Sequence, residues 1–445
     1  MKSYVPIAIL SIAVFMETYT STYLLYDGKN IPLVCIAYFV SGIVIGLVPM
    51  FPISNQMITS SNTLRLFNRI NCLALVLFFI GVSSFFIWHF IDTLNIIHLD
   101  YHYSDNLPQI KVMCQRFLHC EKIYAPIQEI WNGKKSPYMP LMWLPFSVAE
   151  FWGIDMRWTC AVFILVGIFF VFRTVSPRYG FHPFLILLPL ISLSYLFSFI
   201  SVRNREIVGI TEESIVIGFY LFMCYALVRN NPWLIGLALA CCLLSRFVLF
   251  FWAPVYIVYV FLHESKSKAI TISLVSFLII AIVFLIPFGF SDPKYFLNIP
   301  SDYHVGVDTA WNSSYENGVY YGNALGYAKW FDISQIQLLH NMQIIVAAIL
   351  PVILLIIFHL LKNRITLNKQ FWSFCSLKIC LVFFYNMLEV PYYYLFFTST
   401  FFSYAVLFAY LRLYDFNNDS QLKTNSPVEA GNGNRSKLVR SALVF

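Results

Sequence analysis

The sequence predicts an all-α polytopic membrane protein with about ten to thirteen transmembrane helices. Of the 445 residues, 59% are hydrophobic and 11% are charged, whereas about 25% of the residues of a soluble domain are charged. Mean hydropathy is +0.71. So few charged side chains cannot cover the surface of a soluble fold, which excludes a cytosolic enzyme, a disordered chain and a nucleic-acid-binding protein.

Several apolar stretches have about the 20 residues that a transmembrane helix requires. Two others are irregular: residues 138–152 are short and contain two prolines, and residues 231–262 are too long for one crossing and contain Arg246 and Pro254. Some crossings are therefore expected to be short or broken. The regular candidates are residues 4–24, 31–53, 71–92, 157–175, 181–202, 207–228, 269–289, 342–361, 370–388 and 391–412.

Basic residues predict the orientation of the chain, because cytoplasmic loops carry an excess of Lys and Arg. The net charge is +7, and basic clusters at 65–69, 266–268 and 362–369 can share the cytoplasmic side with the C-terminal tail. The long loops 93–137 and 290–341 then lie on the extracytoplasmic side, although the first loop also contains basic residues.

These patterns divide the chain into three expected parts. Residues 1–70 form an N-terminal transmembrane pair with a cytoplasmic loop. Residues 71–414 form a transmembrane core that carries both external loops. Residues 415–445 are rich in Asn, Ser and Gly, which predicts a disordered cytoplasmic tail.

The first external loop contains the pattern of an amphipathic helix. Apolar side chains recur at roughly helical spacing in residues 107–124, which predicts a helix lying on the membrane surface. Asp100 and Asp105 precede it, and a carboxylate held there can act as a general base on a lipid-linked substrate. The alternative for Asp105 is an N-cap, because Ser104-Asp105 before such a run is a helix start signal.

The cysteines predict neither a zinc site nor a redox site, because no C-x-x-C motif occurs. Cys114 and Cys120 share the polar first loop and can form a disulfide if that loop is extracytoplasmic. No metal ligands are assigned.

Ionisable residues within apolar stretches form a second group of candidates, because a charge inside a membrane is costly and usually functional. Arg246 and Lys378 have strongly apolar surroundings, where an anionic partner such as a lipid phosphate explains a cation. The alternatives are a structural ion pair with Glu150, Glu212 or Glu213, or a side chain that extends to the interface.

The second external loop is rich in Tyr, Trp, Asn and Gly. Its aromatic rings can stack on sugar faces or form an interfacial belt. Glu389 and Tyr393 lie farther along the chain, at an external helix mouth with the sequence Glu-Val-Pro-Tyr-Tyr-Tyr. No glycine-rich phosphate loop, H-E-x-x-H or G-x-S-x-G motif occurs, so a nucleotide-using or hydrolase mechanism has no support.

The motifs of the first loop resemble those of the GT-C glycosyltransferases, polytopic enzymes that use polyprenyl-phosphate sugars. An acidic residue after an early span is followed by an amphipathic segment, by Tyr124-Ala125-Pro126 and by Ser136-Pro137-Tyr138-Met139-Pro140-Leu141. Leu244-Ser245-Arg246 is similar to a later family segment. More narrowly, the chain is similar to the bacterial mannosyltransferase-like and aminoarabinose-transferase-like branches. It departs from the family in having two more spans before the loop, and in having Asn106 where the usual acidic pair has its second acid.

The resemblance implies an inverting glycosyltransferase that moves a sugar from a polyprenyl-phosphate donor to a lipid or glycan acceptor, on the extracytoplasmic side of a bacterial inner membrane. Asp105 or Asp100 is the expected general base, and Arg246 and Lys378 are the expected contacts of the donor phosphate. No cofactor other than this donor is expected, and dependence on a divalent metal is left open. The implied substrate-binding residues are Tyr138, Glu212, Glu213, Glu389 and Tyr393.

A transporter or flippase for a lipid-linked or anionic solute is the rival prediction, because buried Arg and Glu also suit transport. A glycan polymerase of the same compartment is a third. The first loop discriminates between the first two: a transferase requires Asp105, whereas a transporter depends on Arg246 and on the Glu212–Glu213 pair.

Overall fold

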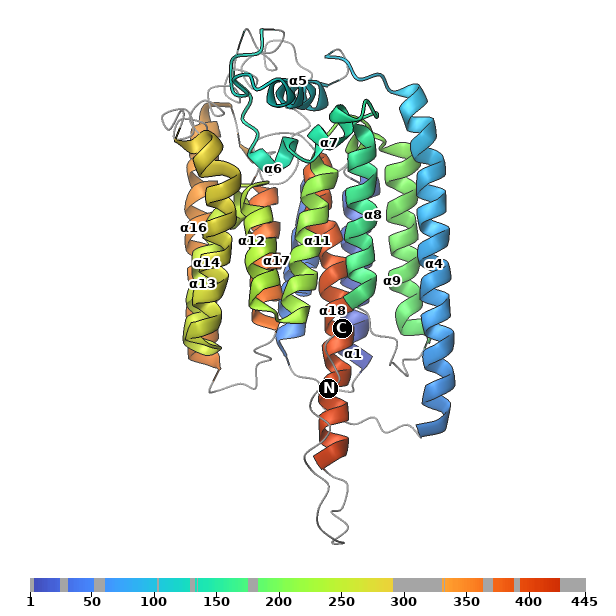
Figure 1. Cartoon of the computed structure of the whole chain (residues 1–445). Coiled ribbons are helices and arrows are strands. Elements are labelled where there is room, and N and C mark those ends of the chain that lie inside the picture. The colour runs from blue at the N-terminus through green and yellow to red at the C-terminus, as the bar shows by residue number, and fades with distance from the viewer. Residues whose placement is uncertain are drawn as a thin grey trace, which may run out of the picture.

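The computed structural model describes residues 4–24, 31–51, 61–101, 104–128, 133, 135–174, 183–290, 330–331, 333–362, 371–387 and 393–424. Within these ranges every regular element is a helix and no β-strand is present. The long helices run side by side in one bundle, and short helices lie across one end of it (Figure 1). We call this end, which carries α5, α6 and α7, the outer end.

Among the described residues, six helices are long and apolar enough to cross a membrane, so the chain is a helical membrane protein, as the composition predicts. The helix α1 continues as a π-helix over Thr20–Leu24, α3 as a 3-10 helix over Val48–Met50, and α14 as a π-helix over Ala281–Gly289. The six are α1 (Tyr4–Tyr19), α3 (Ile31–Leu47), α4 (Ser61–Ile96), α8 (Arg157–Thr174), α14 (Lys266–Ile280) and α16 (Ile336–Leu361).

Further helices complete the bundle. They are α9 (Pro183–Ser198) with a π-helix to Arg203, α11 (Glu213–Arg229), α12 (Pro232–Leu243), α13 (Val248–His263), α17 (Trp372–Asn386) and α18 (Phe396–Thr424). The irregular stretch 231–262 is a hairpin of α12 and α13, and Arg246 lies in its turn. The predicted span 207–228 is likewise broken into α10 (Glu206–Gly209) and α11. Both breaks place charged residues at helix ends, away from the apolar middle of the bundle.

Local capping explains where α11 ends and α12 begins. Asn230 adopts the left-handed conformation, with φ 54°, that commonly ends a helix. The side chain of Asn231 then accepts hydrogen bonds from the backbone N–H groups of Trp233 at 2.9 Å and Leu234 at 3.4 Å. Pro232 follows at the first helical position, where its missing N–H costs nothing.

The amphipathic helix of the first external loop is present, and its apolar side is covered by protein. It forms α5 (Asn106–Leu118), and its apolar residues Leu107, Ile110 and Met113 are fully buried. They face the short helices α6 (Pro140–Trp143) and α7 (Phe146–Phe151). Protein therefore covers the apolar face that was expected to lie against lipid.

The possible disulfide between Cys114 and Cys120 is not formed. Cys114 is buried and its thiol contacts the carbonyl oxygen of Trp143 at 3.4 Å, whereas Cys120 is exposed, and both are free thiols. Cys114 faces inward with the apolar side of α5, while Cys120 follows the end of that helix.

The N-terminal pair α1 and α3 belongs to the same bundle as the core. Residue 70, where the sequence suggests a boundary, lies inside the continuous helix α4. The helix α1 packs against α9 and α18, and α3 packs against α17. Gly42 and Gly46 allow this approach, because a Cβ atom on either would meet Val382 or Ile379 of α17.

Two predicted segments extend beyond the described residues. The helix α18 continues to Thr424, so the first part of the expected tail 415–445 is helical. Residues 425–445, and most of the loop 290–341 with its aromatic candidates, lie outside the described residues.

The helices α8 and α11 also approach closely at glycines. A Cβ atom on Gly218 would lie 2.9 Å from the backbone oxygen of Phe163, and one on Gly167 would lie 3.2 Å from the Cα atom of Gly218. Real Cβ atoms essentially never come within 3.0 Å of such neighbours. Any larger residue at position 218 therefore pushes the two helices apart.

Replacing Gly218 tests this contact. We expect Gly218→Ala to lower stability by about 1–3 kcal/mol, the usual cost of overpacking a tight core. The matched control is Gly81→Ala in α4, where a new Cβ meets nothing within 4 Å, and where higher helix propensity should leave stability unchanged or slightly raised. Thermal unfolding in detergent measures both, and equal effects of the two variants would contradict the packing argument.

Candidate functional site

Five of the residues predicted for the site meet at the outer end of the bundle. The charges of Glu212, Asp105 and Arg246 act on the Tyr138 hydroxyl, and those of Arg246, Glu213 and Asp105 act on Glu212. We call this group the outer cluster; its members are Asp105, Tyr138, Glu212, Glu213 and Arg246.

Each member of the outer cluster stands at or near a helix end. Asp105 and Glu212 occupy the N-cap positions of α5 and α11, and Glu213 is the first residue of α11. Tyr138 lies two residues before α6, and Arg246 lies in the turn between α12 and α13. Ionisable side chains gather there because helix ends let them avoid the apolar interior of the bundle.

A backbone contact joins two of these segments. The N–H of Leu141 in α6 donates to the carbonyl oxygen of Leu244 at 3.1 Å, at the end of α12. The first external loop is thereby fastened to the turn that carries Arg246. This contact explains how residues more than a hundred positions apart form one site.

Arg246 makes the ion pair that the sequence left open as an alternative. Its Nη2 atom lies 3.4 Å from Oε1 of Glu212 and is also hydrogen-bonded to Oε2 of Glu213. The hydroxyl of Thr398 donates to the other oxygen of Glu213. Both glutamates are buried, with exposed fractions of 2% and 0%.

The outer cluster is not fully satisfied. Among the described residues, Oε2 of Glu212 and Nε of Arg246 are buried without a hydrogen-bond partner. Unpaired buried polar atoms are costly in a folded protein and often mark a functional site. With Asp105, the outer cluster brings three carboxylic acids beside one guanidinium.

Asp105 occupies the N-cap position of α5 but does not cap it. Its side chain makes no capping hydrogen bond, and the hydroxyl of Ser104 accepts the backbone N–H of Asn106 at 3.2 Å. The partly buried carboxyl has a raised pKa because burial disfavours its charged form, while a hydrogen bond with the side chain of Gln109 opposes the shift. Asp105 thus occupies the N-cap position that the alternative predicts, but its side chain makes no capping hydrogen bond.

Asp100, the other candidate base, is exposed in the turn after α4. Its carbonyl oxygen accepts the backbone N–H of Ser104 at 3.4 Å. The charges that act on Tyr138 and on Glu212 include that of Asp105, so the described contacts favour Asp105 as the aspartic acid of the outer cluster.

A hydrogen-bonded chain connects Tyr138 to the 3-10 helix Tyr393–Leu395, which precedes α18, and includes residues that the sequence analysis did not single out. The Tyr138 hydroxyl donates to Oδ1 of Asn106 at 2.9 Å, and Nδ2 of Asn106 donates to the Tyr394 hydroxyl at 3.2 Å. Asn106 directly follows Asp105 in the sequence. This neighbouring position is the feature from which its place in the site could have been predicted. Tyr394 follows the predicted Tyr393, whose side chain lies outside the described residues, as does Glu389.

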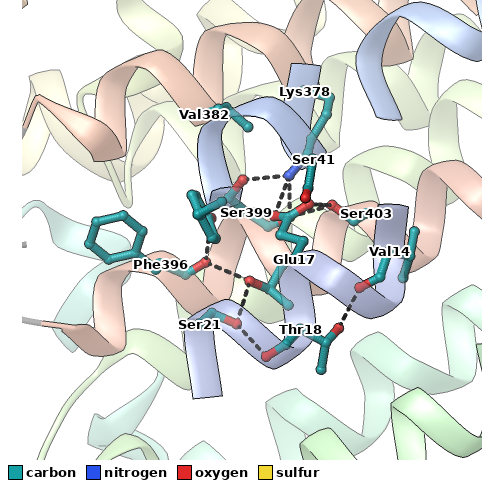
Figure 2. Close-up of polar contacts among 12 residues, drawn as sticks. Val14, Glu17, Thr18, Ser21, Ser41, Lys378, Val382, Phe396, Ser399 and Ser403 are labelled. Carbon is teal, nitrogen blue, oxygen red and sulfur yellow. Dashed lines mark hydrogen bonds and ion pairs between the residues drawn. The ribbon is translucent and has the colours of Figure 1, made fainter. Parts of the chain in front are cut away.

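Lys378 does not join the outer cluster. Its ammonium nitrogen donates to Oε1 of Glu17 at 2.6 Å, to the Ser399 hydroxyl at 2.7 Å and to the Ser399 carbonyl oxygen at 3.0 Å (Figure 2). The hydroxyl of Ser403 donates to the second oxygen of Glu17 at 2.7 Å. We call Glu17, Lys378, Ser399 and Ser403 the inner cluster.

The inner cluster is fully buried and fully paired. The side chains of Glu17 and Lys378 have exposed fractions of 0%, and all three ammonium protons have acceptors. No ammonium proton remains for a lipid phosphate. Lys378 therefore forms a structural ion pair and does not bind the donor phosphate as expected. Sequence reasoning missed Glu17, although an acid inside the apolar stretch 4–24 was a visible signal.

The two clusters are neighbours through α18. Thr398 contacts Glu213 of the outer cluster, and the next residue, Ser399, contacts Lys378 of the inner cluster. Polar side chains of α18 therefore serve both sites.

The chemistry available at the outer cluster is acid–base and hydrogen-bonding chemistry. Among the residues that the structure describes, no group of three or more His, Cys, Asp or Glu side chains is arranged to hold a metal ion. A carboxyl with a raised pKa beside tyrosine, asparagine and arginine donors suits a substrate that carries hydroxyl groups.

Comparisons of the chain with protein-family models, with curated proteins and with solved structures found no match. The likeness to GT-C glycosyltransferases thus rests on the chain's own motifs.

The inner cluster yields a stability prediction. Glu17→Gln and Lys378→Met each leave a buried charge without its partner, and we expect each to lower stability by about 3–5 kcal/mol. The double variant removes both charges and should recover most of this loss. Thermal unfolding of the purified protein in detergent measures all three.

A partly exposed ion pair supplies the control. Lys268 pairs with Glu264 at the opposite end of the bundle from α5, and Glu264→Gln should change stability by about 1 kcal/mol or less. If the double variant of the inner cluster were as unstable as either single variant, the ion pair would not explain the loss.

Proposed function

We propose that the chain is a GT-C-type inverting glycosyltransferase with about ten to thirteen crossings, and that the outer cluster is its active site. The donor would be a polyprenyl-phosphate sugar and the acceptor a hydroxyl group of a lipid or glycan, on the extracytoplasmic side of a bacterial inner membrane. The observation that carries the proposal is Asp105: a partly buried carboxyl that caps no helix and lies within electrostatic reach of Tyr138 and Glu212.

In this proposal Asp105 is the general base. It accepts the proton of the acceptor hydroxyl as the oxygen attacks the anomeric carbon, and the bond between that carbon and the phosphate oxygen breaks. The polyprenyl phosphate leaves as an anion, so no general acid is required. One base suffices, in contrast to the paired carboxylic acids of soluble glycosidases.

Arg246 is proposed to contact the leaving phosphate through its Nε–H group, which has no partner among the described residues. Its Nη2 atom is already engaged with Glu212 and Glu213. The two glutamates would hold the guanidinium at a fixed angle, and a preorganised cation stabilises charge that develops on the leaving group. Lys378 takes no part, because the inner cluster uses all its protons.

Substrate contacts are proposed from the chain of hydrogen bonds beside Asp105. Tyr138 and Asn106 present donor and acceptor atoms next to the carboxyl. Glu389 and Tyr393, at the neighbouring helix mouth, are also proposed to contact the substrate. Hydroxyl, amide and aromatic groups together suit the face of a sugar.

A transporter or flippase is the second candidate, and the Arg246 ion pairs favour it. A cation already balanced by two buried acids can serve as a gate that opens when a solute replaces one partner. The two functions differ in their need for Asp105, because transport does not require a base ahead of α5.

Glycosyl transfer in proteoliposomes tests the proposal directly. A panel of radiolabelled polyprenyl-phosphate sugars is offered to the wild type and to Asp105→Asn, and we expect the variant to lose at least about a hundredfold in rate, as for other general bases. Asp100→Asn is the matched control and should retain activity. Loss with Asp100→Asn but not with Asp105→Asn would move the base to Asp100, and normal transfer by both variants would reject a carboxylate base in this loop.

The pH dependence gives a second test. Since burial raises the pKa of Asp105 and only the ionised base is active, kcat/KM should fall on acidification at a higher pH than the ordinary Asp value of about 3.9 allows. Removing the hydrogen bond from Gln109 should raise this pKa further, so Gln109→Leu should move the acidic limb to still higher pH. An unchanged limb in Gln109→Leu would contradict the assignment.

A further inference from the structure

A polar cavity lies at the outer end, separate from the outer cluster. It has a volume of about 350 Å³ and lies between α5 and the turn that joins α7 to α8. Four ionisable residues line it: Lys111 from α5, Glu150 from α7, and Asp155 and Arg157 at the start of α8. Figure 1 shows α7 between α5 and the outer end of α8.

Two of these residues, Asp155 and Arg157, form a salt bridge with each other. Nε of Arg157 lies 3.0 Å from Oδ1 of Asp155, and Nη2 lies 2.6 Å from Oδ2. The guanidinium also donates to the carbonyl oxygens of Ile97 at 2.6 Å and Leu94 at 3.2 Å, which holds the end of α4. Although burial opposes it, the hydrogen bonds from Arg157 hold the pKa of Asp155 below its ordinary value. This pair is neutral overall and structural.

Lys111 and Glu150 remain available to a ligand. Lys111 is exposed, and its charge acts on Asp155 across the cavity, but among the described residues its ammonium group makes no hydrogen bond. Glu150 accepts one hydrogen bond, from Nε2 of Gln115 at 2.9 Å to its Oε1 atom. The cavity thus offers one cation and one carboxylate oxygen. The complementary ligand carries both an anionic and a cationic group.

The cavity opens at the level where the bundle meets the membrane surface. The apolar part of α4 ends at Ile96, and that of α8 begins at Arg157. Beside the cavity, Phe151 and Trp152 are 70% and 67% exposed, and Ile154 is 48% exposed. Exposed aromatic residues at this level are typical of the interface between hydrocarbon and headgroups. The molecules within reach are therefore the phospholipids of the leaflet at this end of the bundle.

We infer that this cavity binds the headgroup of a phosphatidylethanolamine-type lipid. The lipid phosphate accepts a hydrogen bond from Lys111, and the primary ammonium group donates to Glu150. The acyl chains lie against Phe151, Trp152 and Ile154. A trimethylammonium headgroup cannot donate to Glu150, and a glycerol headgroup lacks the cation. The inference does not depend on the proposed glycosyl transfer.

Native mass spectrometry of the full chain measures this binding. The protein is purified in detergent and equilibrated with equal amounts of phosphatidylethanolamine, phosphatidylglycerol and phosphatidylcholine of matched acyl chains. We expect phosphatidylethanolamine to be retained several-fold more than the other two. Lys111→Gln and Glu150→Gln should each reduce this preference at least about threefold. Lys266→Gln, at the opposite end of the bundle, is the charge-matched control and should not change it.

Three other results would each overturn the inference. Preferential retention of phosphatidylglycerol that depends on Lys111 alone would show a site for any anionic lipid. Equal retention of the three lipids would show ordinary contact with the bilayer. A preference for phosphatidylethanolamine that survives both variants would place its site elsewhere.

Both variants are expected to fold. Lys111 is exposed and Glu150 is half-buried, and substitutions at such positions usually change stability little. In Glu150→Gln the side-chain amide oxygen can still accept the hydrogen bond from Gln115. A loss of lipid preference in either variant therefore reports on the cavity and not on the bundle.

Discussion

The ion pair between Glu17 and Lys378 is the interaction on which the arrangement of the bundle depends. It joins residues 361 positions apart and fastens the first helix to α17 and α18. A charge in an apolar interior is tolerated when a partner and further hydrogen bonds satisfy it. Ser399 and Ser403 supply those bonds from α18, so α1 cannot leave the bundle without exposing both charges to lipid.

The two clusters differ in how completely their polar atoms are paired. In the inner cluster each ammonium proton has an acceptor, and both carboxylate oxygens of Glu17 have a donor. In the outer cluster Glu212 and Arg246 each keep a buried atom without a described partner, and Asp105 does not cap the helix that follows it. A fully paired cluster stabilises the fold, whereas an incompletely paired one at a helix mouth has capacity for a substrate.

The outer end has two layers with different surroundings. The helices α5 and α6 bury their apolar sides on each other and on the bundle. The turn between α7 and α8 points its large apolar residues outward at the edge of the spanning helices. Hydrogen bonds from Arg157 to the end of α4 connect this edge to the bundle. Chemistry at the centre and lipid contact at the rim can therefore coexist without sharing residues.

The class of this protein and the break within residues 231–262 could be predicted from the sequence alone. Composition and the length of apolar stretches predict a helical membrane protein, because burying apolar surface in lipid is a property of each segment separately. The break beside Arg246 follows in the same way, since a charge disfavours the apolar interior wherever the chain goes. The break beside Glu212 was not predicted, because residues 207–228 were expected to form one continuous span. Asp105 and Tyr138 could also be selected from the sequence, because each lies in a short local motif of the first external loop.

The pairing of the charges and the covering of the apolar face of α5 follow from the packing of distant segments. Lys378 was expected beside a phosphate, but it pairs with Glu17, and Arg246 pairs with Glu213. The helix α5 was expected on lipid, but it packs on α6 and α7. An apolar stripe or a buried cation in a sequence indicates that a partner is required, but it does not identify that partner. The partner is chosen by the packing of segments that are distant in the chain, and no local pattern contains that information.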